Sequence, residues 1–248
     1  MTWFIGFSDF SSIRQFSTKS SNTNDTNLNL VIWGTNLTSQ VGSGRFTKQV
    51  SNMIKLPPYQ YSVIIGLLLS DGWISFASKT NKNARLGFSQ SGAHSKYFWF
   101  VFFSLSHYCS SYPNVRNRSS FGKKNKTIAL QFETRSMSCF TELRSLFYLD
   151  DKKVIPLDIY DLLTPVALAH WIMGDGSIQR HGLIICTDSY TVQDVIRLMN
   201  VLIIRYRLEC ILRYHLQTLP RIYIRQRSIP LLQTITRPHM HYSMQYKF

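Results

Sequence analysis

Two aspartates in the sequence lie where a carboxylate is electrostatically unfavourable. Asp71 and Asp175 each end an apolar run, Ile64–Gly72 (IIGLLLSDG) and Leu168–Gly176 (LAHWIMGDG). Each run predicts a helix whose last turn holds the aspartate, where the partial negative charge of the helix end repels a carboxylate. Two such ends that meet repel each other unless a cation lies between them. Oxygen ligands, few side chains and room for water favour Mg²⁺, which suits phosphodiester hydrolysis.

The elements that must position these aspartates are two helices with clear boundaries. The first spans residues 59–71 after Pro57 and Pro58, and the second begins at the N-cap Thr164 followed by Pro165. A glycine after each aspartate predicts a left-handed stop residue. Strand-like residues follow both glycines, so each aspartate joins a helix to a strand.

The rest of the chain predicts the same order of elements twice. After the first helix we expect strands at 73–77 and 85–91, a helix at 95–109, a hairpin of 114–119 with 127–134, and a helix at 136–147. After the second we expect strands at 177–179 and 183–187, a helix at 191–207, strands at 209–214 and 221–227, and a short helix from Ser228. This order predicts an α+β fold with two halves related by a pseudo-two-fold axis and two antiparallel sheets. We expect the halves to be residues 57–150 and 151–248. Residues 1–56 then form an N-terminal extension or linker, which we expect to be partly disordered.

The composition favours a polyanionic partner. The chain has 28 Lys and Arg against 13 Asp and Glu, a net charge of +15. No apolar run approaches the length of a membrane span, and the longest, the aromatic run Tyr97–Phe103, predicts a buried helix. The four cysteines lack the spacing of a zinc site. The positive net charge, without an apolar run of membrane length, makes nucleic acid the favoured partner.

The paired runs are similar to the signature of LAGLIDADG homing endonucleases, and the resemblance extends from about Pro57 to the C-terminus. Gly66, Ser70 and Gly174 fit the small positions where the two motif helices approach each other. His170 departs from the pattern, which would loosen that approach. The resemblance is strongest to the intron-encoded, single-chain branch of organelles. It implies two saddle-shaped sheets around a central pair of motif helices, and a monomer, because one chain carries both motifs.

The resemblance also implies how the chain would act on DNA. Asp71 and Asp175 would be catalytic and would bind Mg²⁺, for which Mn²⁺ can substitute. Lys153 and Lys247 match basic positions of the family and would stabilise negative charge at the phosphates. The product would be a staggered double-strand break with 3′ overhangs in a recognition site of roughly 15–25 base pairs.

Alternating basic residues on the expected strands predict a DNA-binding surface. In the run Arg221–Arg227 (RIYIRQR), Ile222 and Ile224 would face the core while the arginines and Tyr223 face the major groove. The lysines of the 123–126 loop would instead meet phosphates. The candidates for DNA contacts are Arg85, Gln90, Arg116, Arg118, Lys123, Lys124, Lys126, Gln131, Gln179, Arg180, His181, Arg213, His215, Arg221, Tyr223, Arg225 and Arg227.

Three functions remain open on the sequence alone. The first is a site-specific endonuclease that cuts double-stranded DNA and drives intron mobility. The second is an RNA maturase that binds its group I intron, alone or in addition to the first. The third is a DNA-binding regulator without catalysis. Relatives of this branch are mostly organelle-encoded, so we expect a mitochondrial protein, with the chloroplast as the alternative.

Overall fold

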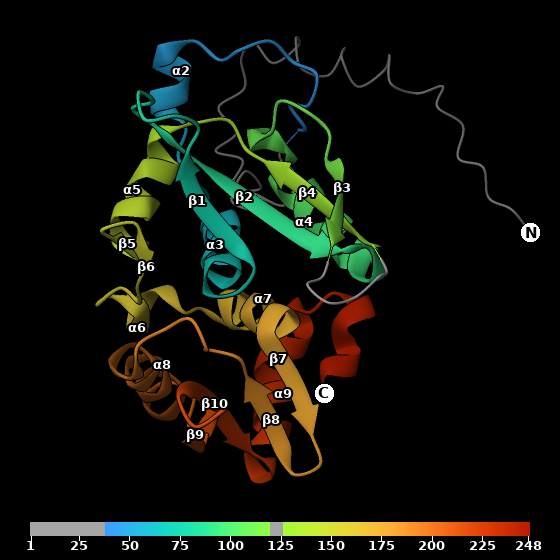
Figure 1. Ribbon diagram of the computed structural model, residues 1–248, viewed down its shortest axis with the longest axis vertical. Coiled ribbons are helices and arrows are strands. Elements are labelled where there is room, and N and C mark those ends of the chain that lie inside the picture. Colours follow the sequence, from blue (N-terminus) through green and yellow to red (C-terminus); the bar gives the residue numbers. More distant parts are fainter. Residues whose placement is uncertain (1–37, 120–125) are drawn as a thin grey trace, which may run out of the picture. The chain divides into compact units, whose positions relative to one another are not determined.

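The computed structural model describes residues 38–119 and 126–248, and its elements follow the predicted order (Figure 1). The first half consists of α3 (Pro58–Leu69), β1 (Gly72–Phe76), β2 (Ala84–Ser91), α4 (Ser95–Leu105), β3 (Asn114–Ser119), β4 (Lys126–Glu133) and α5 (Ser138–Phe147). The second consists of α7 (Pro165–Asp175), β7 (Gly176–Gln179), β8 (Gly182–Ile185), α8 (Val192–Ile204), β9 (Cys210–His215), β10 (Leu219–Arg225) and α9 (Ile229–Thr236). The α+β fold with two similar halves is confirmed.

Short elements complete the two halves. They are α2 (Lys48–Met53), the pair β5 (Tyr148–Leu149) and β6 (Lys152–Lys153), α6 (Ile159–Leu162), and the 3₁₀ turns η2 (Gly92–His94), η3 (Ser106–Tyr108), η4 (Gln226–Ser228), η5 (Arg237–His239) and η6 (Tyr242–Lys247). The β5–β6 pair and α6 join the halves and were not expected from the sequence. In the part of the chain that the structure describes, no helix is long and apolar enough to cross a bilayer.

The two sheets have the same strand order and one buried face each. The orders are β1-β2-β4-β3 and β7-β8-β10-β9, and every pairing is antiparallel. Phe88 and Phe132 pair across the first sheet, as Ile185 and Ile222 do across the second, and all four are buried in the core. Because side chains alternate along a strand, the intervening residues share the opposite face. Each sheet therefore presents one face that the core does not use.

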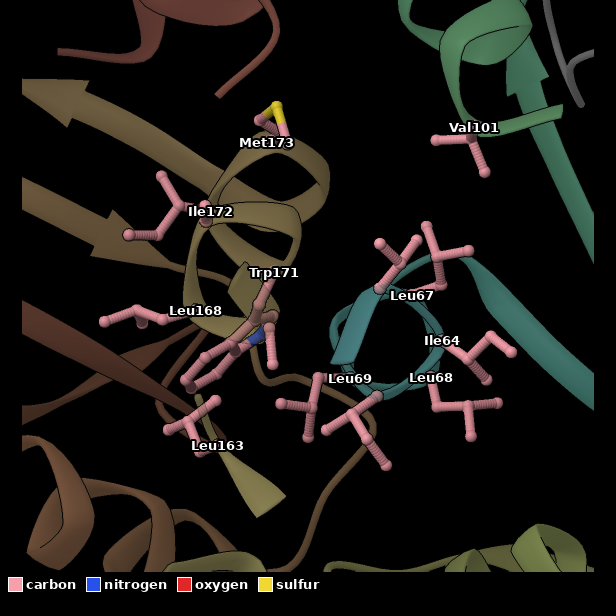
Figure 2. Packing of buried hydrophobic residues seen from close by; sticks show 14 of the residues in the cluster. Ile64, Leu67, Leu68, Leu69, Val101, Leu163, Leu168, Trp171, Ile172 and Met173 are labelled. Carbon is pink, nitrogen blue, oxygen red and sulfur yellow. The ribbon is translucent and has the colours of Figure 1, made fainter. Parts of the chain in front are cut away.

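The motif helices α3 and α7 pack directly against each other. A Cβ atom on Gly66 would lie 2.4 Å from the backbone oxygen of Ala167 and 2.5 Å from the Cβ of His170. On Gly174 it would lie 2.5 Å from the Cβ of Ser70. Figure 2 shows Leu168 and Ile172 on the side of α7 that faces away from α3. The predicted positions thus lie in the helix contact, and His170 does not loosen it, because its ring turns away toward Tyr97.

The glycines after the two aspartates serve a different purpose from the predicted one. Neither has a left-handed conformation; Gly176 has φ −72° and ψ 143°, and both glycines begin strands. A Cβ on Gly72 would lie 2.9 Å from the oxygen of Leu67, and one on Gly176 would lie 2.6 Å from the oxygen of Ile172. Glycine is required because the new strand passes against the helix that it has just left, so the expectation of a left-handed stop was wrong.

The helix contact predicts a large stability effect for one methyl group. Gly66→Ala should lower the free energy of unfolding by about 3 kcal/mol, because backbone and Cβ atoms of α7 cannot move away cheaply. The matched control is Gly44→Ala, whose added Cβ would meet nothing within 4 Å. Chemical denaturation of both variants measures the effect. Equal midpoints would contradict the close approach of α3 and α7.

The N-terminal extension falls only partly within the described residues. Residues 1–37, on which the expectation of disorder mainly rests, lie outside them. From residue 38 onward the chain packs on the first half: the amides of Gln40 and Gly42 donate to the oxygens of Ser106 and Ser110, and Arg135 lies over the ring of Phe46. This part of the predicted linker is therefore structured.

Candidate functional site

The C-terminal ends of α3 and α7 bring the two aspartates together. A Cβ atom added to Gly174, the residue before Asp175, would lie 3.6 Å from Oδ2 of Asp71. Asp71 is exposed, whereas Asp175 lies deeper in the fold. Burial, followed by the charge of Asp71, raises the pKa of Asp175 to about 7, against the opposing effect of two lysines. The two carboxylates thus share one site, and ionising both of them at once is energetically unfavourable.

Each of the two predicted lysines binds carbonyl oxygens at the end of one motif helix. Lys153 Nζ donates to the oxygens of Leu68 (2.9 Å) and Gly72 (2.7 Å). Lys247 Nζ donates to the oxygen of Gly176 (2.7 Å) and more weakly to that of Gly174 (3.4 Å). An ammonium at a helix C-terminus offsets the negative charge that makes an aspartate unfavourable there.

The lysines are partly desolvated while remaining close to the carboxylates. Burial lowers the pKa of Lys153 to about 8, and the charges of Asp175 and Asp71 oppose this effect. Burial also lowers the pKa of Lys247, again opposed by the same two aspartates. The two lysines therefore form one cluster of interacting charges with Asp71 and Asp175.

Gln90, which we predicted to contact DNA, is bonded to one of these aspartates. Gln90 lies two residues after the core residue Phe88 on β2, so both side chains are on the same face of the strand. The Nε2 of Gln90 donates to Oδ2 of Asp71 at 2.9 Å. Gly72 pairs with Phe88 in the first half as Gly176 pairs with Ile185 in the second. Thr187, two residues after Ile185, is therefore the counterpart of Gln90, two residues after Phe88. Thr187 instead donates to the oxygen of Pro220 at 2.6 Å. The two halves of the site therefore differ at this position, because Gln90 donates to Asp71 and Thr187 donates to a backbone oxygen.

One contributor to the site was missed in the sequence. The hydroxyl of Tyr190, in the second half, lies 3.3 Å and 3.4 Å from the oxygens of Leu68 and Leu69 at the end of α3. Tyr190 is buried, and burial raises its pKa well above the usual value for a tyrosine. No spacing in the sequence relates Tyr190 to α3, so only the fold reveals this contact.

The chemistry of the aspartate pair fits a divalent cation. Within residues 38–119 and 126–248, no group of three or more His, Cys, Asp or Glu side chains is arranged to hold a metal ion. A cation here would take its protein ligands from Asp71, Asp175 and nearby backbone oxygens. Burial and then the charge of Asp71 raise the pKa of Asp175, and a bound cation would offset both effects. Few protein ligands and several remaining positions for water or phosphate match the preference of Mg²⁺.

The open face of the first sheet carries polar side chains in the predicted phase. Arg85 pairs with Glu133 at 3.0 Å, and Gln131 lies opposite Asn114 and Ser89 on the same face. Arg116 is exposed on β3. Arg118 and Lys126 belong to β3 and β4, while Lys123 and Lys124 lie outside the described residues.

Two arginines on the open face of the second sheet are held by contacts within the protein. Arg221 Nε and Nη2 donate to the two carboxylate oxygens of Asp188, both at 2.6 Å. The guanidinium of Arg213 lies 3.6 Å from the centre of the Tyr223 ring, whose hydroxyl donates to the oxygen of His181. Arg225 is exposed on the same face. Tyr223 is therefore engaged within the protein and does not project freely as predicted.

The remaining candidates of the second half lie at the ends of this sheet. Arg227 was expected on the last strand, but β10 ends at Arg225 and Arg227 lies in the turn η4, where it pairs with Glu209. The strand ends there because residues Gln226–Ser228 form the 3₁₀ turn η4, although Gln226 N still donates to His181 O beyond the last strand pair. Gln179, His215, and the turn residues Arg180 and His181 are exposed.

Comparisons with known proteins agree with this geometry. A model of the LAGLIDADG DNA endonuclease family matches residues 61–232. The chain is 31% identical over 189 residues to the cytochrome b mRNA maturase bI2 of Debaryomyces hansenii, covering 75% of this chain and 71% of that protein. It is 32% identical over 155 residues to the intron-encoded endonuclease ai4 of Dictyostelium discoideum, covering 60% of this chain and 96% of that protein.

A solved structure is also similar over most of the fold. The homing endonuclease I-WcaI bound to its DNA recognition sequence superposes with a TM-score of 0.74 at 26% identity, covering 83% of this chain and 94% of that one. The paired aspartates at the ends of two packed helices, the repeated sheets and the family match lead to one conclusion: this chain is a member of the LAGLIDADG DNA endonuclease family.

Proposed function

We propose that the chain is a site-specific homing endonuclease that makes a divalent-metal-dependent double-strand break in DNA. The observation that carries this proposal is the pair Asp71 and Asp175, brought together where α3 and α7 lead into the first strands of the two sheets. A net charge of +15 supports a polyanionic substrate. The family membership and the DNA-bound state of the similar I-WcaI structure support duplex DNA as that substrate.

The residues of the site divide into ligands and positioning groups. Asp71 and Asp175 would hold Mg²⁺ or Mn²⁺, which supplies Lewis-acid activation of the phosphate and of water when it is bound. Lys153 and Lys247 would stabilise negative charge that develops on the phosphate oxygens. Gln90 would orient Asp71 through its amide. Both aspartates come from one chain, so a monomer would complete the site.

The proposal is tested by cleavage of two substrates. One is a duplex spanning the exon junction that lacks the intron encoding this chain, and the other is a library of randomised duplexes. We expect Mg²⁺-dependent cutting of both strands with 3′ overhangs, read by sequencing the ends. If the chain bound the junction duplex but left both strands intact in Mg²⁺ and in Mn²⁺, the proposal would be wrong and a regulator would be favoured.

Arg221 should read a guanine, because Asp188 fixes the orientation of its guanidinium. The edge formed by Nε and Nη2 is occupied by Asp188, so Arg221 would donate to guanine O6 and N7 from its Nη1 side. Arg221→Lys should reduce the preference for guanine at one base-pair position by about 10- to 100-fold. Asp188→Asn should reduce it less. Sequencing of the library fragments that each variant cleaves measures the preference.

A neighbouring arginine provides the control for this prediction. Arg225 lies on the same open face and is exposed, so Arg225→Lys should alter the preference at a different position or only weaken binding. An unchanged profile at every position in Arg221→Lys would show that the pair with Asp188 is only structural.

RNA maturation is a second candidate function, favoured by the relatives. Proteins of Debaryomyces hansenii and Saccharomyces cerevisiae that are each 31% identical to this chain are named cytochrome b mRNA maturases. The cytochrome b transcripts in these names are consistent with the mitochondrial origin that we propose. Splicing of the host intron RNA by the purified chain tests this function, and an Asp71→Asn, Asp175→Asn variant should retain it.

A further inference from the structure

Four aromatic side chains are exposed on the surface formed by α4 and η6. The exposed fractions are 37% for Trp99, 66% for Phe103, 64% for Tyr242 and 54% for Tyr246. The sequence predicted that the run Tyr97–Phe103 would be buried, which is wrong for Trp99 and Phe103. We call the four aromatic residues together with Lys96 the aromatic surface.

Ring contacts join α4 and η6 into one surface. Lys96 Nζ lies 5.6 Å from the ring centre of Tyr242, and the rings of Trp99 and Phe103 stack on α4 with centres 5.7 Å apart. His94 stacks on Tyr246 with an interplanar angle of 15°. Lys96, Trp99 and Phe103 are spaced three and four residues apart, so they follow one face of the helix.

The segments that form the aromatic surface carry basic residues and no acidic residues. The sequence has no Asp or Glu between Gly72 and Phe132, and none between Cys210 and Phe248. The segments that form the aromatic surface lie within these two stretches. Exposed apolar groups that cluster on a surface usually mark an interaction site. Aromatic faces that are accompanied by cations and free of acids fit the bases and phosphates of a nucleic acid.

The part of the aromatic surface on α4 is separate from the open face of the first sheet, whereas Tyr246 of η6 lies beside the site, with its ring centre 5.7 Å from Lys247 Nζ. Tyr97, Phe98, Val101 and Phe102 bury the inner side of α4 in the core, and Phe98 stacks on Phe88 of β2. Helix α4 therefore covers the buried face of the first sheet, opposite the face that carries Arg85 and Gln131. A ligand on the outer side of α4 would not compete with a duplex on the sheets.

We propose that the aromatic surface binds unpaired RNA by stacking bases on Trp99, Phe103 and the two tyrosines. A base-paired duplex cannot expose its bases to such rings, whereas loops of an RNA can. Lys96 would pair with a phosphate, and the tyrosine hydroxyls can bond a ribose 2′-hydroxyl, which DNA lacks. The proposal rests on the RNA-binding function suggested above and is independent of DNA cleavage.

The test measures binding of a labelled 12-nucleotide oligouridine by anisotropy. A saturating unlabelled 24-base-pair duplex is present so that the sheet faces are occupied. Phe103→Ala should weaken binding about 10-fold, the expected loss of one stacked base. Lys96→Gln should weaken it a few-fold, and Phe103→Tyr should restore it. The matched control is Tyr160→Ala, which removes an exposed aromatic residue outside the aromatic surface, on α6.

Further measurements make each outcome decisive. Thermal unfolding and DNA cleavage of Phe103→Ala should match those of the wild type, which separates this surface from the catalytic site. Equal binding by Phe103→Ala and Tyr160→Ala would overturn the proposal, as would displacement of the oligouridine by the duplex. Equal affinity for a 12-nucleotide oligothymidine would refute the preference for RNA. Self-association that Phe103→Ala abolishes, without oligouridine binding, would assign the surface to a protein contact.

Discussion

Replacing either Asp71 or Asp175 by asparagine should reduce Mg²⁺-dependent cleavage of both DNA strands by about 10³-fold or more. Each carboxylate supplies charge that the two helix ends and their backbone oxygens cannot replace. A metal contributes several kcal/mol to the stabilisation of a phosphoryl transition state, and 1.36 kcal/mol corresponds to tenfold in rate. Single-turnover cleavage of end-labelled junction duplex, with each strand labelled in turn, measures the loss.

The asparagine variants should still bind DNA. In Ca²⁺, or without metal, their affinity for the junction duplex should equal that of the wild type within a few-fold, because asparagine keeps the size of the side chain and removes a repulsive charge. Asp158→Asn is the matched control, since Asp158 is exposed, and it should cleave normally. Full cleavage by Asp71→Asn would contradict the assignment of this residue as a ligand.

Asp175→Asn should also stabilise the protein at pH 8 in the absence of divalent cations. The pKa of Asp175 is about 7 in the folded protein, against 3.8 as its ordinary value. Between these pH values the folded protein holds a proton that the unfolded chain has released, so the free energy of unfolding falls as the pH rises through this window. At 1.36 kcal/mol per pKa unit, the loss above pH 7 is on the order of a few kcal/mol. Asp175→Asn has no carboxyl group to ionise at this position, so it does not lose this stability.

Urea denaturation in EDTA at pH 4.5 and pH 8 measures this effect. The free energy of unfolding of Asp175→Asn minus that of the wild type should be larger at pH 8 than at pH 4.5. Mg²⁺ should stabilise the wild type at pH 8 and leave the variant nearly unchanged. Asp71→Asn should recover part of the stability, because the charge of Asp71 is one cause of the raised pKa. A constant difference between wild type and variant at both pH values would contradict the buried, repelling pair.

The elements of the fold were predictable because each carries a local signal. Thr164 and Thr191 accept from the amides of Ala167 and Asp194, as their capping positions predict. Alternation of Ile222 and Ile224 with polar residues fixed the phase of β10. The β5–β6 pair and α6 were missed because residues 148–162 show no clear period.

The contacts of the site that the sequence did not reveal join distant segments of the chain. The bond from Gln90 to Asp71 was not predicted, because the face to which Gln90 points could not be fixed from a strand with Ser and Gly at its centre. Tyr190 reaches α3 from the other half of the chain. Asp188 gives no sign in the sequence that it will bind Arg221 through both oxygens. Pattern and spacing therefore locate the acids and the strands, while the fold decides which side chains meet.

The measurement that tests the central claim most directly is strand-resolved cleavage of the junction duplex by wild type and Asp175→Asn, each in Mg²⁺ and in Ca²⁺. The two aspartates at the helix ends predict that the wild type cuts both strands in Mg²⁺ and that Asp175→Asn cuts neither strand at a comparable rate while binding the duplex equally. Equal cleavage by Asp175→Asn in Mg²⁺ would contradict catalysis at the paired helix ends.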